Sequence, residues 1–160
     1  MSGYKIRILS KIIIFLVLFP AIFPGCKKNN SDVIPDTFID FTIDLNNPQY
    51  IDLNVVGNTI MISAQTLGII SLGYDNHGIL IYRASEDEFY AFDRTCPFEE
   101  ELNQAVAIDN AGDVTAECPK CHTEYVLPSY GYPTDKGPGT YPLKMYKTGL
   151  SGTSLHVYHR

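Results

Sequence analysis

The sequence predicts an all-β fold built from small antiparallel sheets, and three observations support this. Apolar and polar residues alternate in short runs, turn residues interrupt those runs, and no segment has a sustained helical period. The clearest run is 38–45, in which four apolar residues share one face: Ile39, Phe41, Ile43 and Leu45. The turn residues Asn46, Asn47 and Pro48 end it.

The same alternation predicts the remaining strands in order. They are residues 50–56, 59–64, 69–72, 79–83, 88–93, 105–109 and 114–117. Turns are predicted at 75–78, 84–87 and 110–112. In a final strand Leu155 and Val157 alternate with His156 and Tyr158, so His156 and His159 are expected at surface or edge positions.

The amino-terminal segment has a different composition from the rest. Lys5, Arg7 and Lys11 precede an apolar run, 12–23, that is shorter than the roughly 20 residues a spanning helix needs. Gly25-Cys26 follows and is similar to the bacterial lipobox. We expect a lipoprotein signal at 1–25, lipidation of Cys26, a polar flexible tether at 26–37 and one domain at 38–160. In the alternative, a plain secretory signal, Cys26 is only a thiol.

The charge of the chain bears on its partners. The formal net charge is −6, and removing residues 1–25 with their three positive charges makes it −9. Lysine and arginine are scattered singly through the domain, so no basic patch is available for a phosphate backbone. Nucleic acid is therefore not an expected partner. The expected location is the cell envelope, outside the cytoplasm and anchored to a membrane.

Two cysteine-proline loops carry the chemistry. The first is Thr95-Cys96-Pro97-Phe98-Glu99, and the second starts at Cys118-Pro119-Lys120-Cys121-His122. If 89–93 runs up into the first loop, 105–109 runs down again and 114–117 returns upward to Cys118. Cys96 and Cys118 are therefore predicted neighbours at one end of adjacent antiparallel strands.

This arrangement resembles the Rieske family, whose members hold a [2Fe-2S] cluster between two hairpin loops. The resemblance extends from Asp44 to the end of the chain. Residues 81–83 and 89–97 resemble the strand pair that leads into the first loop, and Cys118-Pro119 resembles the start of the second, with Tyr125 as the aromatic residue after it. Gly137-Pro138 and Pro142-Leu143 are similar to the proline-rich loop that covers the cluster and to the following strand. The resemblance implies a Rieske-like fold, electron transfer and a redox partner protein.

The ligand set departs from the family pattern, in which two cysteines bind one iron and two histidines bind the other. Cys96 and Cys118 match the cysteine positions. Phe98 stands where the first histidine belongs and Cys121 where the second belongs, with His122 next to it in place of the usual glycine. The candidate cofactor and metal ligands are therefore Cys96, Cys118, Cys121 and His122.

Four states of these loops stay open from the sequence. The first is an iron-sulfur site with three thiolates and a fourth ligand from His122 or Glu99. The second is a zinc site of the Cys-Cys-Cys-His type. The third is a disulfide from Cys96 to either Cys118 or Cys121, which suits an exported protein. In the fourth the cysteines are reduced and only fill space.

The function expected from these features is electron transfer by an exported, lipid-anchored module. The alternative is a cluster-free structural or partner-binding module in which a disulfide or zinc joins the loops. We expect no catalysis by this chain alone, because it has no nucleophilic triad, phosphate-binding glycine loop or paired-carboxylate signature.

Overall fold

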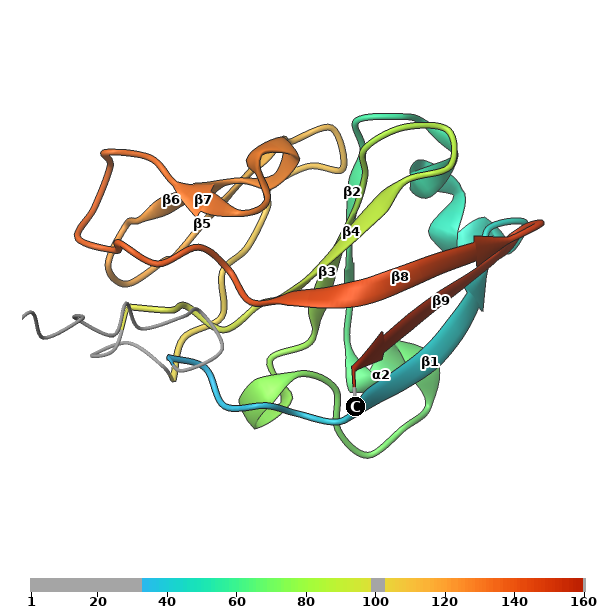
Figure 1. The fold of residues 1–160 in the computed structure, drawn as a ribbon, viewed down its shortest axis with the longest axis horizontal. Helices are drawn as coiled ribbons and strands as arrows, with labels where there is room; N and C mark the ends of the chain where they lie inside the picture. Colours follow the sequence, from blue (N-terminus) through green and yellow to red (C-terminus); the bar gives the residue numbers. More distant parts are fainter. Residues whose placement is uncertain (1–32, 99–102, 160) are drawn as a thin grey trace, which may run out of the picture.

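The computed structural model describes residues 33–98 and 103–159, and they form the all-β fold that the sequence predicts (Figure 1). Six strands make an antiparallel sheet in the order β1-β9-β8-β4-β3-β2. Their bounds are β1 Ile39–Asp44, β2 Thr59–Ile62, β3 Ile79–Arg83, β4 Phe89–Asp93, β8 Met145–Ser151 and β9 Ser154–His159. A smaller antiparallel sheet has the order β5-β6-β7, with β5 Thr115–Glu117, β6 Glu124–Val126 and β7 Tyr132–Pro133.

Two predicted strands are wrong. Residues 50–56 lie mostly in the 3-10 helix η2, Pro48–Asn54, because the Asn47 side chain accepts a hydrogen bond from the Gln49 N–H and Pro48 occupies the first turn. Residues 69–72 form no strand; they follow the single-turn helix α2, Ala64–Leu67, which ends at Gly68 with a φ of 68°. Ile70 is 99% exposed there. The remaining short helices are η3, Tyr74–Asn76, and η5, Leu127–Ser129.

Residues 105–109, predicted as a strand, are only partly paired with their neighbours. They make two isolated antiparallel bridges, Thr95 with Ala105 and Ala107 with Glu117, in place of a continuous strand. The predicted path is nevertheless confirmed, because these bridges connect the first cysteine loop to β5.

The core has two parts, and β3 separates them. Ile79 and Ile81 belong to the cluster of the large sheet, whereas Leu80 and Tyr82 belong to a second cluster with Phe92, Leu127 and Leu143. Successive residues of a strand point to opposite faces, so a strand covered on both sides is apolar throughout. The second cluster includes Cys96, Cys118 and Tyr125, which places the cysteine loops against the core of the small sheet.

The packed part of the chain begins before Phe38, where the sequence pattern placed its start. Val33 and Ile34 are buried, and the buried Lys144 ammonium donates to the carbonyl oxygens of Ile34 at 2.9 Å and Pro35 at 2.8 Å. It also contacts Asp36 Oδ1 at 2.7 Å. Residues 33–36 are therefore fixed to the domain by a lysine that is distant in sequence; we call this contact the Lys144 clasp. Of the predicted tether 26–37, residues 26–32 lie outside the described residues.

The remaining amino-terminal predictions cannot be placed. The predicted signal segment 1–25 and Cys26 lie outside the described residues. Within the ranges 33–98 and 103–159, no helix is long and apolar enough to span a bilayer.

Candidate metal centre

Three thiol side chains meet where the two cysteine loops converge. The Sγ atoms of Cys96, Cys118 and Cys121 all lie within 4.8 Å of one another, and those of Cys96 and Cys121 are 3.6 Å apart. Cys96 and Cys118 are fully buried, Cys121 is partly buried, and all three are unbridged thiols. The predicted proximity of Cys96 and Cys118 is confirmed, and Cys121 completes a thiol triad.

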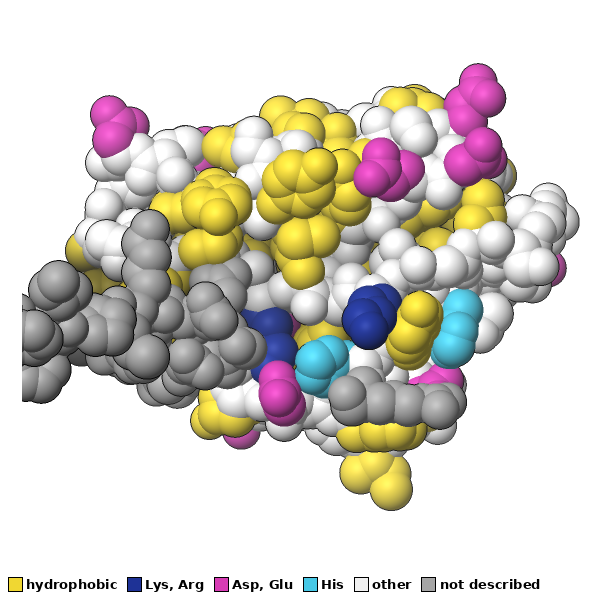
Figure 2. Space-filling view, in the orientation of Figure 1, with side chains coloured by type: hydrophobic (Ala, Val, Ile, Leu, Met, Phe, Trp, Pro, Cys, Tyr) yellow, Lys and Arg dark blue, Asp and Glu magenta, His cyan; other side chains and the backbone are white. Residues whose placement is uncertain are grey.

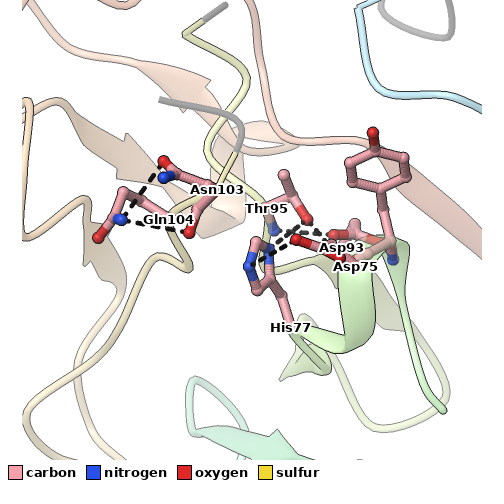
Figure 3. Close-up of polar contacts among 7 residues, drawn as sticks. Asp75, His77, Asp93, Thr95, Asn103 and Gln104 are labelled. Carbon is pink, nitrogen blue, oxygen red and sulfur yellow. Dashed lines mark hydrogen bonds and ion pairs between the residues drawn. The ribbon is translucent and has the colours of Figure 1, made fainter. Parts of the chain in front are cut away.

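A buried aspartate network fixes the start of the first loop (Figure 3). Asp93, the last residue of β4, accepts the Thr95 N–H at Oδ1, 2.8 Å away, and the Tyr74 N–H at Oδ2, 2.7 Å away. The Tyr146 hydroxyl donates to the same Oδ2 at 2.5 Å. His77 Nδ1 lies 2.9 Å from the Thr95 hydroxyl. These bonds set the backbone direction directly before Cys96.

The second loop is a tight connection between β5 and β6. The Cys118 N–H donates to the Thr123 carbonyl at 3.0 Å, and the His122 N–H donates to the Cys118 carbonyl at 2.9 Å. His122 has a φ of 58°, in the left-handed region that glycine adopts most readily. The imidazole is 68% exposed and pairs with Glu117 Oε1 at 3.0 Å. This structure therefore does not bring the predicted ligand His122 to the thiols.

The segment Gly137-Pro138-Gly139 covers the second loop. A Cβ atom on Gly137 would lie 2.5 Å from the Thr123 Cα, and one on Gly139 would lie 2.9 Å from the Tyr125 hydroxyl oxygen. The Gly139 N–H donates to the Thr123 hydroxyl at 2.9 Å. The expected proline-containing cover over this loop is thus present, and glycine allows its close approach.

Hydroxyl and amide groups contact the sulfur atoms directly. Tyr125 is fully buried with its hydroxyl 3.5 Å from Cys96 Sγ, and the Phe98 N–H also bonds to that sulfur. Cys121 Sγ lies 3.3 Å from the Thr123 hydroxyl. Sequence reasoning missed Thr123, although alternation carried back from β6 puts Thr123 and Tyr125, both buried, on one side.

The thiols differ in acidity. Burial raises the pKa of the Cys96 thiol to about 12, against the opposing hydrogen bond from Tyr125. Burial, followed by the neighbouring thiol, raises the pKa of the Tyr125 hydroxyl well above its ordinary value. Burial also opposes ionisation of Cys121, but hydrogen bonds from Thr123, Cys118 and Cys96 outweigh it and lower the pKa of that thiol. The partly exposed Cys121 thiol is therefore more ready to ionise than the buried Cys96 thiol.

These residues do not fit the standard [2Fe-2S] ligand set. Such a cluster needs four protein ligands, divided between two irons. Within the described ranges, the group of candidate ligands around this point contains only the three cysteines. Phe98, at the position of the first histidine, packs its ring against the core cluster that contains Cys96. Glu99, the substitute ligand considered from the sequence, lies outside the described residues.

The other histidines on β9 lie at the surface, as predicted. His156 Nε2 is 2.9 Å from Asp40 Oδ1, and His159 Nε2 is 3.2 Å from Asp36 Oδ1. Figure 2 shows histidine side chains beside Lys or Arg and hydrophobic side chains on one face of the molecule. Each of these histidines contacts an aspartate carboxylate, and neither belongs to the thiol triad.

Comparisons with known proteins give structural neighbours only; no family model and no curated protein matches the sequence. The ferredoxin of carbazole 1,9a-dioxygenase from Nocardioides aromaticivorans is 18% identical, with 78% of this chain and 100% of that chain covered and a TM-score of 0.45. A complex of reduced oxygenase and oxidized ferredoxin in carbazole 1,9a-dioxygenase is 17% identical, with 64% of this chain and 82% of that chain covered and a TM-score of 0.43. A Mycobacterium tuberculosis structure described as the small subunit of an NADH-dependent nitrite reductase is 15% identical. It covers 78% of this chain and 98% of its own, with a TM-score of 0.42.

Because all three TM-scores lie between 0.42 and 0.45 and all three identities between 15% and 18%, the function is argued from the chain's own residues. Its topology brings two cysteine loops together beside a small antiparallel sheet, and a Gly-Pro-Gly segment covers the second loop. The protein has the all-β architecture and loop arrangement expected of a Rieske-like fold.

Proposed function

We propose that this protein is an exported, lipid-anchored electron-transfer module whose two cysteine loops bind iron through thiolates. The single observation that carries the proposal is the thiol triad, with all three Sγ atoms within 4.8 Å of one another. Export and lipidation at Cys26 are supported by the basic, apolar and Gly-Cys pattern of residues 1–26. The tip of the loops then exchanges electrons with partner proteins near a membrane surface.

The residues around the triad suit this role. Thiolate-bound iron supplies one-electron transfer between Fe(III) and Fe(II), with a donor protein providing the electron and an acceptor protein removing it. Cys96, Cys118 and Cys121 would hold the metal, and to a Cys96 thiolate the Tyr125 hydroxyl and the Phe98 N–H would donate hydrogen bonds. Hydrogen bonds to sulfur and burial raise or lower the reduction potential of such a centre. Catalysis would belong to a partner chain.

The test is iron loading of the full chain under anaerobic conditions, followed by visible spectroscopy and voltammetry. We expect thiolate-to-iron charge-transfer bands and a reversible one-electron wave, both lost in Cys96→Ala and Cys118→Ala. Cys26→Ser is the matched control: it should keep the bands and the wave but leave the membrane fraction of expressing cells. Iron-loaded protein without a reversible wave would refute electron transfer.

A specific distance supports one alternative, a cluster-free module in which a disulfide joins the loops. Cys96 Sγ and Cys121 Sγ are 3.6 Å apart, which favours this pair as the cross-link. Removing such a bond from a small exported domain costs about 2–5 kcal/mol. In that case the air-purified protein would be colourless, and peptide mapping would find Cys96 joined to Cys121.

A further inference from the structure

The spacing of the thiol triad matches one metal ion. In structural zinc sites the metal–sulfur distance is about 2.3 Å and the geometry is tetrahedral, which places the sulfur atoms about 3.8 Å from one another. The Cys96 and Cys121 sulfurs are 3.6 Å apart, and no pair in the triad is separated by more than 4.8 Å. A small contraction of the longer separations would bring all three sulfurs around one centre.

Two irons would require a different arrangement. In a two-iron cluster, ligands on different irons are kept apart by the second iron and the bridging sulfides. By its family position Cys121 would bind the second iron. Its sulfur is nevertheless only 3.6 Å from the Cys96 sulfur, which is the separation expected of two sulfur ligands on one ion. The second iron would also lack its other ligand, because Phe98 carries a phenyl ring and packs against the core.

We propose that Cys96, Cys118 and Cys121 take up one thiophilic ion, with a fourth coordination position that no described residue fills. This inference rests on the proposed function as a thiolate metal centre and assigns that centre one ion in place of two. Three thiolates select the soft and borderline ions, namely Cu(I), Zn(II) and Fe(II).

The described neighbours of the triad do not fill the fourth position. The His122 imidazole is paired with Glu117, and the buried Tyr125 hydroxyl is hydrogen-bonded to Cys96 Sγ. Across residues 33–98 and 103–159, no histidine, aspartate or glutamate joins the thiols as a fourth ligand. Cys121 is the least buried of the three, so a water or anion would approach the ion on its side.

The test is a Co(II) titration of the full-length apo chain without oxygen. A Cys26→Ser background keeps that thiol from binding the probe. We expect one Co(II) per chain, with intense sulfur-to-cobalt charge-transfer bands and the visible bands of a tetrahedral site. One equivalent of Zn(II) should displace it. Cys121→Ser should weaken binding by more than the roughly 10–100-fold that loss of a ligand's hydrogen-bond partner costs.

The matched control is His122→Ala, which should bind Co(II) within about twofold of the parent, since the ring is paired elsewhere. Circular dichroism is used to check that each variant is folded. The number of Co(II) ions bound by the parent chain tests the inference even if a variant does not fold. Loss of binding in His122→Ala would overturn the three-thiolate site. Binding of no Co(II) would overturn the inference as well.

A parallel reconstitution with iron and sulfide separates this inference from the proposed function. Two irons and two sulfides per chain with a reversible wave would overturn the single ion and leave electron transfer standing. One ion per chain without a reversible wave in the iron form would refute electron transfer and leave the single-ion site standing.

Discussion

Replacing Lys144 by methionine should unfasten the amino-terminal segment from the domain. The Lys144 side chain is only 4% exposed, and its ammonium donates to the Ile34 and Pro35 carbonyl oxygens at 2.9 and 2.8 Å. Methionine has a similar length and fills most of the same volume, but it donates no hydrogen bond. The substitution therefore removes the donor and leaves little empty space.

The magnitude follows from the two carbonyl groups that lose their donor. An unsatisfied buried acceptor costs about 1–3 kcal/mol, and Ile34 is almost fully buried, whereas the Pro35 bond is partly buried. The released Asp36 carboxylate is exposed and can be hydrated, so its contact with Lys144 is left out of this sum. We therefore expect the variant to lose about 3 kcal/mol of unfolding free energy.

Urea unfolding of the purified chain, followed by circular dichroism, measures this loss. Lys136→Met is the matched control, because Lys136 also pairs with a carboxylate, Glu117, but is half exposed; its stability should not change measurably. Limited proteolysis should cut the Lys144→Met protein near residue 33 faster than the parent. Equal stability of the two variants, or an unchanged cutting rate, would refute the structural role of the clasp.

Three further predictions concern the clasp, the cover and the thiols. Lys144, through its hydrogen bond and charge, keeps the pKa of Asp36 below its ordinary value of 3.8. The stabilisation of the folded state by this contact is therefore complete above pH 3.8 and is lost as the pH falls through the lowered pKa. Asp36→Asn should abolish this part of the acid dependence of urea unfolding. Gly137→Ala should cost about 1–2 kcal/mol from its φ of 85° alone, and more from the contact with Thr123, measured as a lower urea midpoint. Mild oxidation should join Cys96 to Cys121 and prevent metal uptake, as shown by peptide mapping and Co(II) titration.

Each of these has an outcome that would contradict it. Gly149→Ala is the control for the cover, because a Cβ at Gly149 meets nothing within 4 Å, and equal midpoints for the two alanine variants would speak against the close approach. If Asp36→Asn had the same acid dependence of unfolding as the parent, the Asp36 carboxylate would not be its source. Oxidised protein that still takes up one Co(II) would show that the thiols are not its ligands.

The strands were predictable wherever burial determined the pattern. The run Ile79 to Tyr82 is apolar because both faces of β3 are covered, and β1 alternates because neighbouring residues differ in exposure. Residues 50–56 show the same alternation, yet Asn47 and Pro48 start a 3-10 helix there. The capping residues outweighed the strand-like alternation at that position, and the hydrophobic pattern alone contains no sign of the cap.

The candidate site was predictable only as far as chain connectivity reaches. The up-down-up path of three segments was enough to bring Cys96 and Cys118 together. It could not give the direction of the His122 side chain, which depends on a left-handed backbone at that residue. The Lys144 clasp joins residues 108 positions apart, and no local pattern in the sequence connects them.

The Lys144 clasp also limits how far the domain could be held from a membrane. If Cys26 carries the lipid, only seven residue steps separate it from the buried Val33, and a chain of that length spans at most about 25 Å. A tether running to residue 38 would add five more steps and about 17 Å. With the lipid on Cys26, the shorter connection would hold the domain close to the lipid headgroups, and a redox partner would have to present its own centre near the same membrane surface.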